Sequence, residues 1–359
     1  MAFKTAADTP RYRTVLLARF SALGDVAMTV PSVYSACRRY PEVRFVFITR
    51  TSMTSIFVDP PENLVLEGVD LKGEYEGTGG LIRLARHLVA TYSPDIFVDL
   101  HNVLRTKVIS AYLLLKGIST VRIVKPRSKR RALTRRHNKV LLPLKSQLER
   151  YREAFAAAGL ESDDSFEGLY CGQGKADTAD FATITEPKKP GEKWVGIAPF
   201  AAHQGKIYPP ELMEKVVARL QEEYGGRLRI FLFGGGDHEK AVLEQWQERY
   251  PCAQSLAGKR YGFKAELALL NHIDVAVTMD SANMHLAALA GTPTVSVWGA
   301  THPYCGFRGW RQKEELTVQL PMDCRPCSVF GNKPCLRGDY LCLAAIKPEL
   351  ILNKVKNYL

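Results

Sequence analysis

The chain has 359 residues, a hydrophobic share of 46% and a formal net charge of +12. This length is typical of two domains, and the hydrophobic share is ordinary for a globular protein. No apolar run approaches the ~20 residues of a membrane span, and the polar residues 1–14 lack the apolar core of a signal peptide, so we expect a cytoplasmic protein. The positive charge predicts an anionic partner: nucleic acid, an acidic membrane or a polyanionic substrate.

The first half of the chain alternates predicted strands with predicted helices. We expect strands at 14–18, 43–48, 96–99 and 121–124, and helices at 31–40, 81–91, 103–116 and 147–159. After the first strand, Gly24 permits a tight turn that presents Asp25 beyond the strand's carboxyl edge. Such a carboxylate can act as a general base toward a hydroxyl, or it can simply cap a turn. The spacing does not match the G-x-G-x-x-G pattern of nicotinamide-binding folds.

The positive charge is concentrated between residues 122 and 139, where nine Lys and Arg residues occur without an acidic one. This run contains no aromatic residue to stack on single-stranded nucleic acid, and the chain shows no recognised nucleic-acid motif. Two interpretations remain. The run is either a solvated basic loop or a patch that binds phosphates or carboxylates at a membrane face.

A polar region at 161–193 predicts a linker, and a second alternating series begins after it. We expect strands at 194–200, 228–232, 275–277 and 294–298, and helices at 210–224, 238–250, 263–271, 282–290 and 348–358. The fold class is therefore α/β. Two such series joined by a linker suggest two doubly wound domains that face each other across a cleft.

Candidate ligand groups follow several strands of the second series. Lys206 could neutralise a phosphate, and Glu239, after a Gly-rich turn, could accept ribose hydroxyls. Asp280 and Ser281 are good helix-capping types, and Ser281 and His285 are spaced to face one ligand. A capping Asp and a core His are the alternative for this last group. The shared position at strand ends favours a phosphorylated, sugar-like ligand.

Four of the eight cysteines form a C-x2-C-x7-C-x6-C cluster near the end of the chain: Cys324, Cys327, Cys335 and Cys342. Four thiols at this spacing could hold a structural zinc ion. Plain thiols or disulfides are the alternatives, and a cytoplasmic setting disfavours disulfides.

Three motifs of the chain resemble those of glycosyltransferase family 9, the ADP-heptose:lipopolysaccharide heptosyltransferases. They are ARFSALGDVAMTVPSV, GKIYPPE and TMDSANMHLAALAGTPTVSVWG, and the likeness extends from about Thr14 to Leu352. The resemblance implies a GT-B fold of two Rossmann-like domains, with the acceptor at residues 1–175 and the nucleotide sugar at 176–345. It further implies that a last helix within 346–359 packs back on the first domain.

The resemblance also implies an activity: inverting transfer of heptose from ADP-heptose to the Kdo/heptose inner core of lipopolysaccharide, without a metal or other cofactor. It makes Asp25 the catalytic base. It assigns donor binding to Lys206, Glu239, Asp280, Ser281, Ala282 and His285, and the basic residues suggested for the acceptor are Arg105, Arg130, Arg131, Arg136 and Arg150. Ala282 replaces the family's usual Gly, which changes how closely the diphosphate can approach the backbone. Ala201 and Ala202 replace hydroxyl residues of some members, so the phosphate contacts there must come from backbone N–H groups or be absent.

Such an enzyme would be a monomer bound peripherally at the cytoplasmic face of the inner membrane, with no nucleic-acid partner. Two alternatives remain open at this point. One is a related glycosyltransferase that uses another nucleotide sugar for a surface glycan. The other is a non-catalytic, polyanion-binding protein on the same scaffold, against which the joint presence of Asp25, Lys206 and Asp280 argues.

Overall fold

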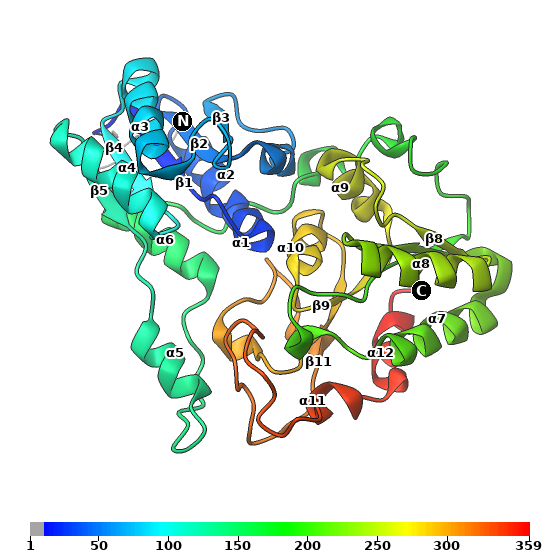
Figure 1. Ribbon diagram of the computed structural model, residues 1–359. Coiled ribbons are helices and arrows are strands. Elements are labelled where there is room, and N and C mark those ends of the chain that lie inside the picture. The colour runs from blue at the N-terminus through cyan, green and yellow to red at the C-terminus, as the bar shows by residue number, and fades with distance from the viewer. Residues whose placement is uncertain (1–10) are drawn as a thin grey trace. The chain divides into compact units, whose positions relative to one another are not determined.

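The computed structural model describes residues 11–359, so most of the polar N-terminal stretch lies outside the described residues. The chain divides into two compact units, each built around a parallel sheet (Figure 1). The first unit comprises Met1–Lys125 and Gln147–Glu167, and the second comprises Pro126–Ser146 and Gly168–Leu359. The predicted pair of α/β domains is confirmed. The division differs from the expected boundary after residue 175, because the basic stretch Pro126–Ser146 belongs to the second unit.

The sheet of the first unit has the strand order β3-β2-β1-β4-β5, and its neighbouring strands are all parallel. The strands are β1 (Thr14–Ala18), β2 (Arg44–Arg50), β3 (Leu64–Val69), β4 (Ile96–Asp99) and β5 (Ser119–Arg122). The helices are α1 (Leu23–Ala27), α2 (Val30–Arg39), α3 (Gly77–Tyr92), α4 (Leu104–Leu115) and α6 (Gln147–Ala157). The expected strand at 121–124 thus lies slightly earlier, and β3 had not been predicted.

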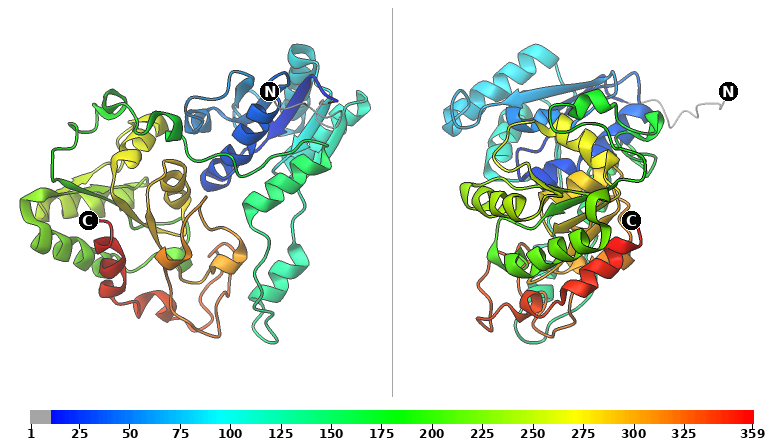
Figure 2. Two further views of the ribbon diagram at one scale, coloured as in Figure 1. Left: turned by 180° about the vertical axis from the view of Figure 1, so that it is seen from behind. Right: turned by 90° about the vertical axis from the view of Figure 1, so that its right-hand side faces the viewer.

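Helices cover both faces of this sheet, as the two views in Figure 2 show. On one face, Leu16 and Val46 pack with side chains of α3 and α4 in a single apolar cluster. On the other face, α2 packs against α6. Burial on both sides explains why β1 and β2 are nearly continuous apolar runs, as is usual for a parallel sheet.

The second unit contains a six-stranded parallel sheet with the order β11-β10-β9-β6-β7-β8. Its strands are β6 (Lys193–Ala198), β7 (Leu228–Leu232), β8 (Ala253–Ser255), β9 (Val275–Met279), β10 (Thr294–Val297) and β11 (Thr317–Val318). Its helices are α5 (Arg127–Thr134), α7 (Pro210–Tyr224), α8 (Asp237–Arg249), α9 (Phe263–His272), α10 (Ala282–Leu289), α11 (Leu341–Ala344) and α12 (Pro348–Lys356).

The last helix, α12, packs within the second unit. Its contacts are with α7, β9 and β10, and Ile351 and Val355 are fully buried in the unit's main apolar cluster. The expectation that the last helix also packs on the first domain stays a prediction. Within residues 11–359, no helix combines the length and the apolar character that a bilayer crossing requires.

Candidate active site

Asp25 lies just beyond the carboxyl end of β1, as predicted, but its local structure differs from the prediction. Gly24 and Asp25 belong to the short helix α1 rather than to a tight turn. The Asp25 carboxylate accepts the Ala22 N–H at 3.4 Å and forms an ion pair with Arg19 at 2.7 Å. The Asp25 side chain is 23% exposed, so it stays accessible to a ligand while one side of it is held.

Arg19 is the buried partner of that carboxylate, and its side chain is only 8% exposed. Its guanidinium also donates to the Leu100 carbonyl at 2.9 Å, which fixes the group between the ends of β1 and β4. Tyr151 of α6 donates its hydroxyl to the Asp25 carbonyl at 3.0 Å and so anchors α1. The sequence analysis missed Arg19, although a lone cation between a buried strand and the Gly24–Asp25 pair was a usable signal.

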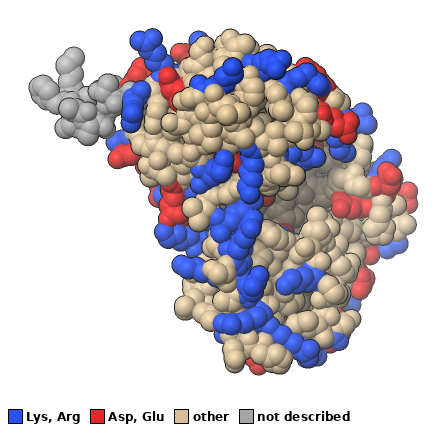
Figure 3. Space-filling view, turned by 60° about the vertical axis from the view of Figure 1, so that its left-hand side comes forward, with Lys and Arg blue, Asp and Glu red and all other residues tan. Residues whose placement is uncertain are grey.

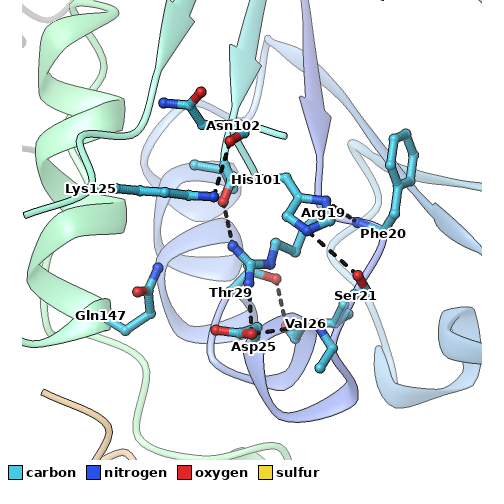
Figure 4. Close-up of polar contacts among 12 residues, drawn as sticks. Arg19, Phe20, Ser21, Asp25, Val26, Thr29, His101, Asn102, Lys125 and Gln147 are labelled. Carbon is cyan, nitrogen blue, oxygen red and sulfur yellow. Dashed lines mark hydrogen bonds and ion pairs between the residues drawn. The ribbon is translucent and has the colours of Figure 1, made fainter. Parts of the chain in front are cut away.

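His101 follows β4 and lies at the same edge of the sheet (Figure 4). Its Nδ1 accepts the Phe20 N–H at 3.4 Å, and its Nε2 is 3.5 Å from the Ser21 hydroxyl. Burial, followed by the charges of Arg19 and Lys125, lowers the pKa of His101 to about 3. The imidazole is therefore neutral at physiological pH and cannot act as a general acid there. It was not predicted as a site residue.

In this site the Asp25 carboxylate lies near cations whose positions are fixed by hydrogen bonds. Figure 4 shows Arg19 reaching from the end of β1 toward Asp25, with Lys125 and Gln147 nearby. Lys125 donates to the Asn102 carbonyl at 3.0 Å, so its ammonium is held in place as well. The arrangement can take a proton from a hydroxyl through Asp25 and can attract an anionic substrate.

In the second unit, Lys206 and Asp280 form an ion pair at 2.9 Å. Lys206 ends the short 3₁₀ turn Gln204–Lys206, and Asp280 directly follows β9. Their side chains are 16% and 4% exposed, and the Thr301 hydroxyl also donates to Asp280 at 2.8 Å. The structure thus brings these two predicted residues into direct contact. In this structure the lysine's charge is engaged by a buried carboxylate.

Ser281 is the N-cap residue of α10, but its hydroxyl makes no capping hydrogen bond. Its Oγ is buried and finds no hydrogen-bond partner among the described residues. Ala282 begins the helix, and His285 lies buried one turn further on. A buried hydroxyl without a partner costs free energy, so a ligand with an acceptor oxygen would satisfy it. The helix N-terminus beside it favours an anion.

Glu239 lies in the first turn of α8, after the Gly-rich turn. Its carboxylate accepts the Gly235 N–H at 2.7 Å, so it stabilises that turn from within. Gly236 is the N-cap residue of the same helix. The position agrees with the expected place at a strand end, where a ribose could lie against a carboxylate.

The five arginines suggested for the acceptor fall into two groups. Arg105, Arg131 and Arg136 are exposed. Arg130 instead packs its guanidinium over the rings of Phe307 and Phe330, and Arg150 is 4% exposed and donates to the Gln147 side chain at 2.7 Å. The last two are thus held by neighbours within their own units.

The clustered cysteines Cys324, Cys327, Cys335 and Cys342 line one small cavity in the second unit. All four are free thiols. Within residues 11–359, no three His, Cys, Asp or Glu side chains are arranged to hold a metal ion. The disulfide alternative is not present in this structure.

The sequence matches the family described as glycosyltransferase family 9 (heptosyltransferase) over residues 82–334. Lipopolysaccharide heptosyltransferase 1 from Pseudomonas aeruginosa is 25% identical over 338 residues, covering 87% of this chain and 85% of that protein. Lipooligosaccharide heptosyltransferase 2 from Campylobacter jejuni is 25% identical over 174 residues. That match covers 47% of this chain and 52% of the other protein, so the chain spans about half the length of this relative.

Two solved structures share the fold. A family 9 glycosyl transferase from Veillonella parvula has a TM-score of 0.71 at 16% identity, with 100% of this chain and 99% of that one covered. The E. coli heptosyltransferase WaaC with ADP has a TM-score of 0.66 at 18% identity, with 96% and 100% covered. Together with the two parallel sheets, these likenesses confirm the predicted GT-B class of two Rossmann-like domains.

Proposed function

The chain belongs to glycosyltransferase family 9, and from this premise we propose that it transfers heptose from ADP-heptose to the inner core of lipopolysaccharide. The observation that carries the proposal is Asp25, a partly exposed carboxylate held by a buried arginine at the carboxyl edge of a parallel sheet. Ligands of open α/β sheets bind at this edge. The names of the curated relatives support heptose as the sugar and a lipid-linked saccharide as the acceptor.

We propose that Asp25 acts as the general base. It takes the proton of an acceptor hydroxyl while that oxygen forms a bond to the anomeric carbon of the donor sugar. The bond from this carbon to the diphosphate oxygen breaks, ADP leaves with the electron pair, and the sugar inverts. The pair Arg19–Asp25 suits this role because the ion pair fixes one carboxylate oxygen and the exposed part of the group can meet the hydroxyl.

The second unit is the proposed donor site. Lys206 and the N-terminus of α10 would stabilise the departing diphosphate, and the unpartnered Ser281 hydroxyl would donate to a phosphate oxygen. Asp280 would orient the sugar, with His285 beside it, and Glu239 would accept hydrogen bonds from the ribose hydroxyls. The Lys206 ammonium would then lie between the diphosphate and Asp280 and contact both, so that the buried carboxylate keeps its cation. Ala282 lets a phosphate approach the backbone of the helix start with only a methyl group in the way.

For the acceptor, we propose that the exposed Arg105, Arg131 and Arg136 contact acidic sugars and phosphates of the core. Arg130 and Arg150 are given a positioning role, because neighbouring side chains already hold them. Such an acceptor would place the enzyme at the cytoplasmic face of the inner membrane. A family 9 enzyme with a different nucleotide sugar remains the second candidate, since the relatives are only 25% identical.

The test is nucleotide release from ADP-, UDP- and GDP-sugars, with and without a Kdo-bearing lipid A acceptor. We expect release of ADP from ADP-heptose only when the acceptor is present. Acceptor-dependent release from another donor would transfer the mechanism to that sugar. Release from none of them would overturn the proposed activity.

Asp25→Asn tests the base directly. We expect at least a 100-fold loss of turnover, within the usual contribution of general base catalysis, and unchanged ADP affinity by calorimetry. Asp59→Asn is the matched control, because Asp59 is exposed in the same unit and its left-handed backbone conformation suits Asn. Wild-type turnover in Asp25→Asn would remove the assigned role.

A further inference from the structure

The stretch Pro126–Ser146, called the docking segment from here on, carries eight Lys and Arg residues and no Asp or Glu. It consists of α5 and a length of chain that turns and runs back beside it, which Figure 1 shows below the α5 label. The Val140 N–H donates to the Ala132 carbonyl at 3.1 Å and closes this hairpin-like shape. The segment is therefore an ordered feature of the second unit.

One side of the docking segment is fixed to the rest of that unit. The Arg130 guanidinium lies 5.6 Å and 5.3 Å from the ring centroids of Phe307 and Phe330. Leu133 is 1% exposed. Further along, the Lys139 ammonium donates to the Asp323 carbonyl and the Leu144 N–H donates to the Tyr304 carbonyl. These contacts leave the opposite side to face solvent.

The solvent side combines charge with apolar surface. Five cations of α5 and the turn after it are exposed: Arg127, Lys129, Arg131, Arg135 and Arg136. Val140, Leu141 and Leu142 follow at 40%, 52% and 64% exposure. Single exposed aliphatic residues are ordinary, but three in succession beside a cluster of cations call for a partner. Figure 3 shows Lys and Arg side chains gathered over the lower part of the molecule, with few acidic ones among them.

We propose that the docking segment binds the surface of an anionic phospholipid bilayer. Arg127, Lys129 and Arg135 would lie among the lipid phosphates, and Val140, Leu141 and Leu142 would insert at the boundary with the acyl chains. A basic helix beside exposed aliphatic side chains is the chemistry that interfacial binding uses. The proposed function explains why such binding would be useful, since a lipid-linked acceptor is reached at that surface. The binding itself is argued from the docking segment alone.

Two other occupants fit the segment less well. A nucleic acid would satisfy the cations but not the three aliphatic side chains, and residues 126–146 hold no aromatic residue for base stacking. A second copy of the same segment would bring two clusters of positive charge together, which is repulsive. A lipid surface offers phosphates to the basic side chains and, just beneath them, an apolar layer that the neighbouring aliphatic side chains can reach.

The test is co-sedimentation of the full-length protein with lipid vesicles that contain no lipopolysaccharide. We expect binding to vesicles of phosphatidylglycerol and phosphatidylethanolamine, weakening as salt is raised, and no binding to pure phosphatidylcholine. Each basic side chain near an anionic surface contributes about fivefold to partitioning. The variant Arg127→Gln/Lys129→Gln/Arg135→Gln should thus bind about 100-fold more weakly.

A second variant tests the apolar part. Val140→Ser/Leu141→Ser/Leu142→Ser removes no charge, and we expect at least a tenfold loss of vesicle binding. The matched control is Lys215→Gln/Arg219→Gln/Arg227→Gln, which removes the same charge from exposed positions on and after α7 and should bind as the wild type. Thermal unfolding of every variant checks that it is folded.

Three outcomes would overturn the proposal: no binding of the wild type to anionic vesicles, equal losses in the control, or unchanged binding in both docking-segment variants. Retained binding in the apolar variant with loss in the charge variant would indicate a polyanion site instead of a bilayer contact. Transfer to a water-soluble, deacylated acceptor is measured separately. Normal vesicle binding without sugar transfer would reject the proposed activity while leaving the membrane contact standing.

Discussion

At the scale of single residues, the proposed site of each unit depends on an ion pair with one buried member. In the first unit the buried member is the cation Arg19, and in the second it is the carboxylate Asp280. A buried charge that loses its partner is costly, so each pair fixes the geometry of its more exposed member. The exposed members are Asp25 and Lys206, the groups to which we assign chemistry.

Arg19 should act as a positioning residue for Asp25. In Arg19→Gln the carboxylate loses its 2.7 Å ion pair, and we expect kcat to fall by about 100-fold, as for a misplaced catalytic group. The KM for the donor should stay unchanged, because the proposed donor site lies in the other unit. Arg19→Lys should recover part of kcat, which a purely structural role would not require. A parallel rise in KM would contradict this assignment.

Lys206 and Asp280 can be separated by paired substitutions. Lys206→Met leaves a carboxylate that is 4% exposed without its cation, and we expect a loss of about 3 kcal/mol in unfolding free energy. Lys206→Met/Asp280→Asn should recover most of that stability in urea unfolding, yet remain deficient in ADP release. Recovery of turnover in the double variant would show that Lys206 serves stability alone.

At this scale the sequence located the strand ends but not the contacts between side chains. Asp25, Lys206 and Asp280 could be singled out because each follows a recognisable apolar strand. Arg19 and His101 were missed because their partners lie about 80 residues away along the chain, at the neighbouring strand. The unpartnered state of the Ser281 hydroxyl is likewise a property of packing, which residue type does not reveal.

At the scale of elements, the loop that carries Lys206 is tied to the end of the chain. Tyr208 is fully buried, and its hydroxyl donates to the Ile346 carbonyl at 2.8 Å, just before α12. The Ala300 N–H donates to the Gly205 carbonyl at 2.8 Å, which connects the same loop to the segment after β10. These two hydrogen bonds connect the lysine loop to the segment before α12 and to the segment after β10.

Tyr208→Phe should weaken this connection without changing the apolar packing. The lost hydrogen bond contributes about 1 kcal/mol, and the Ile346 carbonyl would be left without its donor. We expect Tm to fall by about 2–4 °C. The donor KM should change little, since the hydroxyl bonds the Ile346 carbonyl and none of the proposed donor-binding residues. An unchanged Tm would mean that Ile346 finds another donor.

Long, strongly patterned elements were predicted well. The strand Thr14–Ala18 and the helix Pro210–Tyr224 have the predicted bounds, because apolar runs and helix-start prolines mark them clearly. The missed strands were short or mixed in character: β3 carries Glu67 and Gly68, and β8 and β11 are three and two residues long. Such segments become strands because they pair with neighbouring strands, and their local sequence alone does not predict this.

At the scale of the whole molecule, the chain returns to units that it has already left. The first unit resumes at Gln147 after the docking segment, so the chain passes from one unit to the other three times, after residues 125, 146 and 167. A division by linker composition finds a single boundary, and for this reason the sequence suggested one near residue 175. Net charge behaves differently, because the sequence itself places the excess at residues 122–139, and the structure adds only which of these side chains are exposed.

The molecule's stability should depend on pH through opposing groups. Burial lowers the pKa of His101 to about 3 and of His302 to about 4, so stability falls as acid protonates these histidines in the unfolded chain. Burial of Glu266 in α9 acts in the other direction and raises its pKa from 4.5 to about 7. Between these values the folded state holds a proton that the unfolded chain releases, so this group destabilises the fold as pH rises.

Glu266→Gln isolates that contribution, because the histidines are common to both proteins. At pH 5 the two proteins should differ by less than about 1 kcal/mol, since pH 5 lies only slightly above the ordinary pKa of 4.5, although the unfolded carboxyl is already mostly ionised. At pH 8 the variant should be the more stable by up to about 3 kcal/mol, which corresponds to the full shift in pKa. Urea unfolding at both pH values measures the difference. A gap that stays constant from pH 5 to 8 would show that Glu266 ionises in the fold as easily as in the unfolded chain.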